Sequence, residues 1–292
     1  MKKGSVIVIA FDGLDKNLIE EFDLETITQK EFGSIDNNTK ISVRSTSELF
    51  ASFITGENYR KHGIEGLTIR NNEYIQSLED SLPDNVFFNK FKGIRESFYS
   101  TDLIDAMKRK PEKKDLGSET IFEKVNDSRA MYVPGYNPSK LWKYGFSMGK
   151  LLSLGNSKIE IENFLRDREF KVRKEKLFSE LENDIVSPRK LLMCHFHLSD
   201  WMHHLYGDKK SGNWNRKKLL KLYNELDDFA RDIKHRAKKA GYEHVIFMSD
   251  HGLPDKEAHN KNAFYSSNTE LFGDQTPHIT DFHDTILQIT GN

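Results

Sequence analysis

The sequence contains only one cysteine, Cys194, among its 292 residues, so no disulfide can form within the chain. Proteins with so little cysteine are typical of a reducing compartment, and we expect a cytoplasmic protein. Long apolar runs are also missing, because no segment approaches the roughly 20 apolar residues that a membrane span needs. The first apolar run stops at Asp12 without a small-residue cleavage site after it, so we interpret it as a strand and not as a secretion signal.

An excess of charge of either sign is absent too. The 44 basic and 45 acidic residues give a net charge of −1. This balance offers no electrostatic reason to expect a nucleic-acid polymer or an acidic membrane as a partner. A hydrophobic share of 37% and a charged share of 30% are typical of a soluble globular protein whose length allows a sizeable core. The composition favours no particular oligomeric state.

Three short apolar runs predict buried strands. They cover residues 5–11 (SVIVIAF), 190–198 (KLLMCHFHL) and 245–248 (VIFM). Residues 215–240 form an amphipathic pattern that predicts a long helix between the second and third strands. Strand, helix and strand in this order indicate parallel pairing. We therefore expect an α/β fold with a mostly parallel central sheet and helices on both faces.

The middle third of the chain differs in character. Residues 82–188 contain charge runs such as MKRKPEKK and few strand signals, although residues 159–183 have helical spacing. We expect one domain over residues 1–292, with residues 82–188 as a peripheral cap or insert region within it. This region could shape a substrate pocket or could be solvated packing.

Two of the predicted strands end in a carboxylate. Asp12 follows the first strand, and Asp250 with His251 follows the third. The carboxyl edge of a parallel sheet is where such proteins build their sites. Adjacent carboxylate and imidazole groups suit Zn, Mn or similar ions. The alternatives are that Asp250 and His251 are loop residues and that Asp12 caps a turn or the helix that starts near Asp15.

A carboxylate and an imidazole, both common metal ligands, also follow the second predicted strand. Asp200 and His204 are four residues apart, so a helix after Ser199 would put both on one face, with His203 pointing elsewhere. His195 and His197 alternate on the strand itself, and we expect them to be structural and not ligands.

Three more histidines follow the third strand. His259 lies in a polar loop that is short enough to fold back on the site. His278 and His283 are the remaining candidates, and His283 is expected at the surface of the closing helix.

A hydroxyl group is available at a predicted helix start. Ser45 and Glu48 have the spacing of a capping box, and Gly56 ends the helix. Thr46 then lies in the first turn, where free amide groups and the helix dipole favour a bound anion. The alternative is that Ser45, Thr46 and Ser47 only cap the helix.

Together these positions provide three carboxylates, three imidazoles and one hydroxyl at strand ends or helix starts. Two divalent ions would bring four positive charges against three negative ones, so the loaded site would attract a phosphate ester. The set consists of Asp12, Thr46, Asp200, His204, Asp250, His251 and His259.

The motifs resemble those of the alkaline phosphatase superfamily, and most closely its type I phosphodiesterase / nucleotide pyrophosphatase family. They are FDG at 11–13, TG at 55–56, HGIEG at 62–66, DWMHHLYG at 200–207, SDHG at 249–252 and the later His259. The resemblance implies an alkaline-phosphatase-like fold with a nucleophile that maps to Thr46, with Ser47 as the fallback. It also implies a covalent phosphothreonine intermediate that water later hydrolyses.

The resemblance further implies two divalent ions, Zn or alternatively Mn. One would be held by Asp12, Asp250, His251 and Thr46, and the other by Asp200, His204 and His259.

The chain departs from the family pattern at two positions. Relatives often have proline where this chain has Glu48, and asparagine that contacts the phosphoryl oxygen where it has Leu67. We hypothesise that Arg44 supplies the missing phosphate contact.

The sequence therefore predicts a two-metal phosphoric ester hydrolase, a phosphodiesterase or nucleotide pyrophosphatase, that acts on a small phosphate ester. A phosphomonoesterase on the same scaffold is the first alternative. A catalytically inactive ligand-binding member is the second.

Overall fold

The computed structural model describes residues 3–39, 45–70, 108–139, 155–208, 213–254 and 259–292. Six strands form a central sheet in the order β2-β10-β9-β1-β6-β5. Strands β5, β6, β1 and β9 run parallel, and β10 and β2 continue the sheet with antiparallel pairing. The bounds are β1 Val6–Phe11, β2 Glu31–Ser34, β5 Ser128–Met131, β6 Leu191–Phe196, β9 His244–Met248 and β10 Phe264–Ser267.

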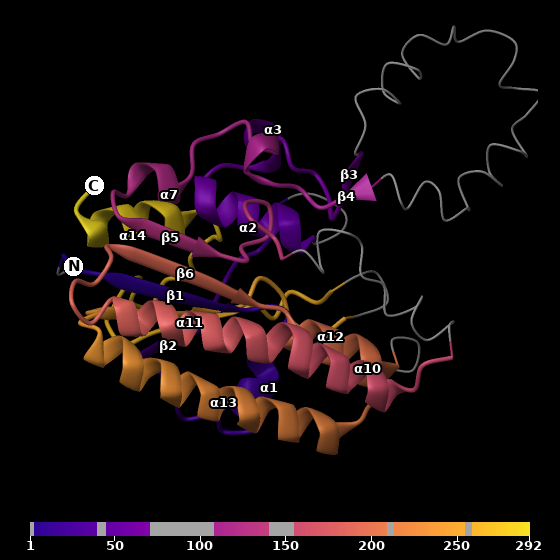
Figure 1. Cartoon of the computed structure of the whole chain (residues 1–292). Helices are drawn as coiled ribbons and strands as arrows, with labels where there is room; N and C mark the ends of the chain where they lie inside the picture. The colour runs from indigo at the N-terminus through magenta and orange to yellow at the C-terminus, as the bar shows by residue number, and fades with distance from the viewer. Residues whose placement is uncertain (1–2, 40–44, 71–107, 140–154, 209–212, 255–258) are drawn as a thin grey trace, which may run out of the picture.

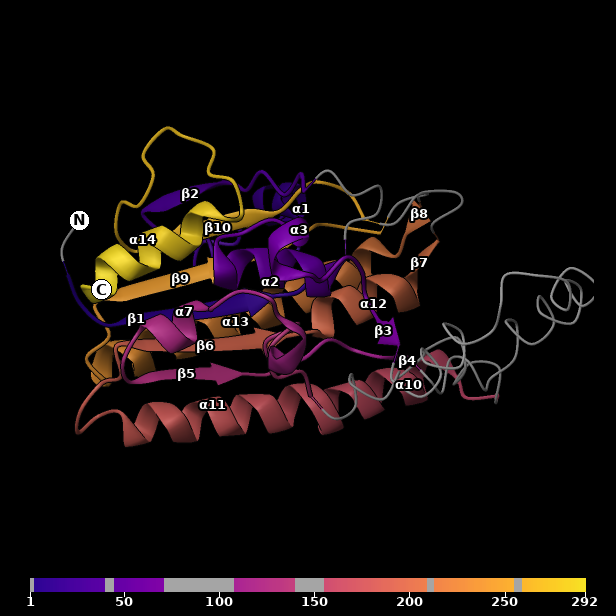
Figure 2. The same cartoon turned by 90° about the horizontal axis from the view of Figure 1, so that it is seen from above.

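Helices cover both faces of this sheet (Figures 1 and 2). One face carries α1 Lys16–Glu21, α10 Lys158–Leu165, α11 Lys171–Asn183, α12 Leu198–Tyr206 and α13 Arg216–Lys239. The other carries α2 Thr46–Thr55, α7 Ile121–Lys124 and α14 Asp281–Thr290, with the short α3 Tyr59–His62 next to α2. The predicted α/β architecture with a mostly parallel sheet is confirmed.

Strand β1 shows why its sequence is continuously apolar. Ile7, Ile9 and Phe11 pack on the face covered by α13, while Val6 and Val8 pack on the face covered by α2 and α14. A central strand alternates its side chains between two covered faces, so neither set can be polar.

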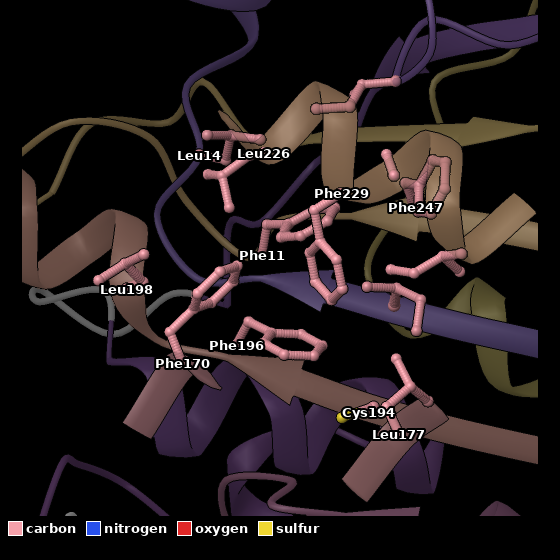
Figure 3. Packing of buried hydrophobic residues seen from close by; sticks show 14 of the residues in the cluster. Phe11, Leu14, Phe170, Leu177, Cys194, Phe196, Leu198, Leu226, Phe229 and Phe247 are labelled. Atoms are coloured by element: carbon pink, nitrogen blue, oxygen red, sulfur yellow. The ribbon is translucent and has the colours of Figure 1, made fainter. Parts of the chain in front are cut away.

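Aromatic rings fill the core between the sheet and α13 (Figure 3). Phe229 of α13 meets Phe11, Phe170 and Phe196 edge to face, with ring centroids 6.3, 5.1 and 4.9 Å apart. Phe11 and Phe196 are the last residues of β1 and β6. This packing therefore holds the two strand ends at which the candidate site begins.

The predicted helices agree with the structure in position. The long helix expected at 215–240 is α13, and the apolar residues on one face of it, including Leu222 and Leu226, are buried. The helical segment expected at 159–183 consists of α10 and α11 joined by a π-helical turn, η3 Arg166–Phe170. The sequence also predicts a short strand at 41–43, before the predicted helix at 45, but these residues lie outside the described ones.

The span expected as a cap, 82–188, lies partly outside the described residues. Its described part includes β5, which pairs with β6, and α11, which packs against α13. It also includes the short strand β4 Lys108–Arg109, which pairs with β3 Ile69–Arg70, and a 3-10 turn, η2 Lys113–Asp115. A second small pair joins β7 Gly207–Asp208 and β8 Asn213–Trp214. For residues 82–188, the division of the chain into one domain with a cap or insert region stays a prediction.

Among the helices of the described ranges, none has both the length and the apolar character that a transmembrane crossing requires.

Candidate active site

The candidate site lies at the carboxyl edge of three neighbouring strands, β9, β1 and β6. Asp12 directly follows β1, Asp250 and His251 follow β9 after one serine, and Asp200 lies in the first turn of α12 after β6. Parallel strands end at the same edge, so these side chains converge although they are far apart in the sequence.

The inner group consists of Asp12, Thr46, Asp250 and His251. Nε2 of His251 lies 3.2 Å from Oδ1 of Asp12 and 3.5 Å from Oδ2 of Asp250. Oγ1 of Thr46 lies 3.5 Å from Oδ1 of Asp12 and 3.3 Å from Nε2 of His251. All four side chains are buried. The hydroxyl predicted to be the nucleophile thus lies between a carboxylate and an imidazole.

The outer group consists of Asp200, His204 and His259. Oδ1 of Asp200 lies 3.2 Å from Nε2 of His204 and 3.4 Å from Nε2 of His259. The two imidazole nitrogens are 3.3 Å apart. The ring of His259 also stacks on that of His251 at 3.8 Å, so the inner and outer groups adjoin.

These separations fit metal coordination. Zinc ligands lie about 2.0–2.1 Å from the ion, so two ligand atoms of a tetrahedral site are about 3.3 Å apart. The contacts within both groups span 3.2–3.5 Å. Oδ1 of Asp200 and Oδ2 of Asp250 are buried and accept no hydrogen bond. Since a buried carboxylate needs compensation, the residues fit a pair of divalent cations.

The pKa shifts of the buried carboxylates also favour a bound cation. Burial raises the pKa of Asp250 to about 7, and the nearby Asp12 carboxylate adds to this effect. Burial also opposes ionisation of Asp12, but His197, His195 and His251 outweigh it and hold that pKa well below the ordinary value. Two buried carboxylates, Asp12 and Asp250, therefore lie close together, and a bound cation would stabilise the ionised form of both.

His251 is oriented by its own loop. Its Nδ1 lies 2.8 Å from the carbonyl oxygen of Gly252, which can only accept, so Nδ1 carries the proton. Nε2 faces the inner group, where burial opposes protonation but the Asp250 and Asp12 carboxylates raise the pKa of the ring to about 10; a bound metal would take the place of the Nε2 proton.

His195 and His197, expected to be structural, both contact Asp12. Arg173 can only donate, and its Nη1 lies 3.4 Å from Nδ1 of His195, so Nε2 of His195 carries the proton that faces Oδ2 of Asp12 at 3.2 Å. His197 contacts Asp12 through Nδ1 and lies 3.5 Å from Oδ2 of Asp200 through Nε2. The two histidines support the ligands of both groups. The only sequence signal was their alternation on a strand that ends at the site.

Asp15 positions the loop that carries His259. Its carboxylate accepts from the backbone amide of Leu253 at 3.1 Å and from the side chains of Asn260 and Asn262 at 2.8 and 3.2 Å. It also caps α1 through the amide of Asn17 at 2.9 Å, a role that the sequence analysis considered for Asp12. One buried carboxylate therefore connects the first helix to the loop of the outer group.

Gly13 separates the inner and outer groups. Its φ is +68°, a left-handed conformation that favours glycine, and a Cβ there would lie 3.1 Å from both Cβ of Asp200 and Cε1 of His251. The close approach of the two groups thus requires the absence of a side chain at residue 13.

Helix α2 begins at Thr46 as predicted, but the predicted capping box is wrong. Ser45 makes no side-chain cap, and Glu48 turns inward. Glu48 accepts from Thr39 at 3.1 Å and from Ser52 at 3.5 Å, because burial among these hydroxyl groups competes with the helix terminus. The first-turn amides of α2 are therefore not bound by the Ser45 hydroxyl.

His62, from the HGIEG motif, has a structural role. Its Nδ1 accepts from the amide of Ile64 at 3.1 Å, so its Nε2 donates to Oγ of Ser52 at 3.0 Å. Burial lowers its pKa to about 4. The motif thus attaches the 62–66 loop to the helix that carries Thr46.

Lys110 is a site residue that the sequence reasoning missed. It directly follows β4 and is only 7% exposed. Burial lowers its pKa to about 8, against the opposing effect of the Asp12 and Asp200 carboxylates. Its charge therefore interacts with one carboxylate of the inner group, Asp12, and one of the outer group, Asp200. A charge run, MKRKPEKK, surrounds it in sequence and gave no signal that one lysine would be buried.

The remaining candidates lie elsewhere. His203 bonds to the hydroxyl of Tyr223 at 3.2 Å and points away from the site, as expected. His278 bonds to Thr280 at 2.7 Å. His283 was expected at the surface, which is wrong: it is 4% exposed because its ring packs against Gly56. Arg44 lies outside the described residues.

Acidic and imidazole side chains thus converge at the carboxyl edge of a mostly parallel sheet, as in an α/β hydrolase that could hold metal ions. The family model for type I phosphodiesterases / nucleotide pyrophosphatases matches residues 6–275. The chain therefore belongs to this family.

Solved structures of murine ectonucleotide pyrophosphatase / phosphodiesterase 5 are similar to this chain. One has a TM-score of 0.44 and 15% identity over 85% of this chain and 57% of that chain. Another, an inactive variant in complex with AMP, has a TM-score of 0.45 and 13% identity over 86% of this chain and 57% of that chain. The present chain thus spans little more than half of these relatives. A comparison with curated proteins found no significant match.

Proposed function

We propose that the chain is a two-metal phosphodiesterase or nucleotide pyrophosphatase that acts on a small phosphate ester through a covalent phosphothreonine intermediate. The observation that carries this proposal is the position of Oγ1 of Thr46, 3.3 Å from Nε2 of His251 and 3.5 Å from Oδ1 of Asp12. Family membership supports the reaction class.

The proposed ligands are Asp12, Asp250, His251 and Thr46 for one ion and Asp200, His204 and His259 for the other. When bound, two divalent ions, zinc or manganese, would favour loss of the Thr46 proton and neutralise charge on the transferring oxygens. Imidazole and carboxylate ligands suit both metals.

The chain's own residues perform the remaining steps. Oγ1 of Thr46 attacks phosphorus, its proton passes to solvent, and the bond to the leaving alcohol or phosphate breaks. The first-turn amides and the dipole of α2 stabilise the anionic group beside Thr46. Water then attacks phosphorus, the bond to Oγ1 breaks, and the free hydroxyl is regenerated.

A phosphomonoesterase is the second candidate. The buried ammonium of Lys110 favours it, because a further positive charge near Asp12 and Asp200 suits a dianionic phosphoryl group. We also propose a cytoplasmic location, which the lone, buried Cys194 supports.

The test uses bis-para-nitrophenyl phosphate as the diester and para-nitrophenyl phosphate as the monoester. Metal-loaded wild type, Thr46→Ala and Ser47→Ala are compared, with the metal content of each determined. Ser47 is the matched control because it is the neighbouring hydroxyl and its Oγ donates to the carbonyl of Leu67 at 3.3 Å.

We expect Thr46→Ala to bind about two ions and lose turnover, and Ser47→Ala to keep it. Mass spectrometry after an acid quench should detect phosphate on Thr46 in the wild type. Turnover by Thr46→Ala with loss in Ser47→Ala would move the nucleophile to Ser47, and a wild type that binds no metal would overturn the proposal.

A further inference from the structure

Asp250 lies just beyond the paired part of its strand. Strand β9 ends at Met248, and a bond from the amide of Ser249 to the carbonyl of Phe264 at 2.9 Å continues the pairing with β10 by one residue. The backbone carbonyl of Asp250 accepts instead from Nδ2 of Asn37 at 2.8 Å. A side chain from another segment therefore holds the backbone of an inner-group residue where the strand pairing has ended.

The Asn37 carboxamide is part of the protein interior. Asn37 is 2% exposed, and Asp250 has no exposed surface. Burying a carboxamide is costly unless it forms hydrogen bonds, so its donor contributes most where it finds an acceptor inside the protein. Asn37 follows β2, which is separated from β9 by β10 in the sheet. The bond therefore connects the ends of two strands that are not neighbours.

The loop after β2 is anchored to the segment that precedes α14. The amide of Asp36 donates to the carbonyl of Pro277 at 2.8 Å, and the amide of Ile279 donates to the carbonyl of Asp36 at 2.9 Å. Nε2 of His278 lies 3.3 Å from the carbonyl oxygen of Asn38, which can only accept, so His278 donates there. The loop is thus fixed by three bonds from outside the site.

The same loop also reaches the helix that carries the proposed nucleophile. Thr39 donates to Oε2 of Glu48 at 3.1 Å, and both side chains are buried. Glu48 lies in the first turn of α2, which begins at Thr46. Oγ1 of Thr46 and Oδ2 of Asp250 lie 3.3 and 3.5 Å from the same atom, Nε2 of His251. One loop therefore contacts both segments whose side chains meet at His251.

We propose that Asn37 is a positioning residue of the inner group: through a brace formed by residues 36–39, it fixes the Asp250–His251 pair relative to Thr46. This inference rests on the proposed function. Loss of the bond from Asn37 would release the backbone of Asp250 and shift its carboxylate. A bound ion tolerates only small displacements of its ligands, so the inner ion depends on Asn37 and the outer ion does not.

The experiment compares wild type, Asn37→Asp, Thr39→Val, their double variant and Asn224→Asp. Asn37→Asp keeps the shape of the side chain but places an acceptor against the Asp250 carbonyl. Thr39→Val removes the bond at the other end of the brace with little change in volume. Asn224, exposed on α13, is the matched control for the added charge.

Three measurements are made on each protein. Competition with a chelator gives the affinity of each ion, and His259→Ala, which lacks an outer ligand, shows which affinity belongs to the outer group. The values of kcat and KM are determined on both nitrophenyl phosphates at saturating metal. Urea unfolding of the metal-free protein gives its stability.

We expect Asn37→Asp to weaken the inner ion about 10–100-fold and to leave the outer ion unchanged. At saturating metal, kcat should fall about tenfold and KM should change less than about twofold, because Asn37 holds the backbone of Asp250 and does not contact the substrate. Thr39→Val should weaken the same ion to a smaller extent. The double variant should lose less than the product of the two single losses, since one brace carries both contacts. Asn224→Asp should match wild type.

The proposal is overturned if Asn37→Asp binds both ions like wild type, or if it weakens both ions equally while the free energy of unfolding falls, as a merely structural residue would. Single losses that multiply in the double variant would overturn the brace. Failure of the proposed function is distinguishable from these outcomes. A wild type that binds two ions but hydrolyses neither ester would reject the phosphodiesterase, and a selective loss of the inner ion in Asn37→Asp would still support the role of Asn37.

Discussion

The inner and outer groups contain similar carboxylate and imidazole side chains but differ in how the fold holds them. Asp12, Asp250 and His251 have no exposed surface, and Thr46 is 3% exposed. The side chains of His204 and His259 are 22% and 17% exposed. The inner ligands follow two central strands and begin a buried helix, whereas the outer imidazoles come from α12 and a loop. The inner group is therefore preformed by the core, and the outer group depends on a more accessible segment.

This difference predicts unequal metal affinity. Ligands that are locked by packing and by supporting hydrogen bonds need little reorganisation on binding an ion. We expect an ion in the inner group to exchange slowly and one in the outer group to exchange readily. The following predictions test this contrast, beginning with the largest expected effect.

Asp12→Asn should abolish the function of the inner group. The change keeps the size of the side chain but removes the charge that faces Thr46 and His251. We expect kcat/KM to fall more than about 10³-fold, because the nucleophile loses its activation. Metal analysis should detect one ion fewer, and excess metal should not restore activity. Asp167→Asn, an exposed change of the same kind, should leave both quantities unchanged.

His259→Ala should weaken the outer group in a reversible way. At stoichiometric metal we expect kcat/KM to fall about 10²-fold, since one of three protein ligands is lost. Activity should recover as metal is added, because the remaining ligands are accessible. Titration of activity against free metal measures this. Recovery by Asp12→Asn, with none by His259→Ala, would reverse the contrast between the groups.

His195→Gln should have a smaller effect, confined to the inner group. Its Nε2 faces Oδ2 of Asp12 at 3.2 Å, and Nη1 of Arg173 lies 3.4 Å from its Nδ1. Loss of such a supporting contact typically lowers metal affinity 10–100-fold. Competition with a chelator should show that the tighter ion is weakened and the weaker ion unaffected. His244→Gln, at the opposite end of the sheet, serves as the control, and equal weakening of both ions would contradict the prediction.

His62→Gln should affect stability more than catalysis, because His62 is connected to the inner group only through Ser52 of α2, the helix that begins at Thr46. Burial lowers the pKa of His62 to about 4, so the unfolded chain binds a proton that the folded chain excludes. The stability due to neutral His62 is complete above about pH 6.5 and is lost as pH falls toward 4.

Urea unfolding of metal-free protein between pH 8 and pH 4 measures this dependence. The free energy of unfolding should fall less steeply with acid in His62→Gln than in wild type. His235→Gln, an exposed change on α13, should follow the wild-type slope. A His62→Gln slope equal to that of wild type would show that this histidine does not control the acid response.

The sequence predicted best the features that depend on neighbouring residues in the chain, such as strand ends and residues on one face of a helix. Apolar runs that end in Asp12 and Asp250 located both strand ends, since a buried strand stops where a charge begins. The spacing of Asp200 and His204 placed both on one face of a helix, and the structure brings them within 3.2 Å. Their metal-binding role stays a prediction.

Contacts between distant segments were not predictable in this way. Lys110 lies in a charged stretch, and nothing local distinguishes it from Lys113 or Lys114. Glu48 had the spacing of a capping box, but Thr39 and Ser52 bind its carboxylate inside the protein. In each case a partner elsewhere in the fold determines what a polar side chain does, and periodicity carries no such information.

The bare backbone at Gly13 limits how this protein can change over generations. A single added carbon there would press on Asp200 and His251 at once, so one mutation would disturb both groups together. A substitution of Asp12 or His259 acts first on the group to which that residue belongs, whereas any side chain at residue 13 acts on both groups at once. The spacing of the two groups therefore depends on one position, and glycine is the residue that leaves this space open.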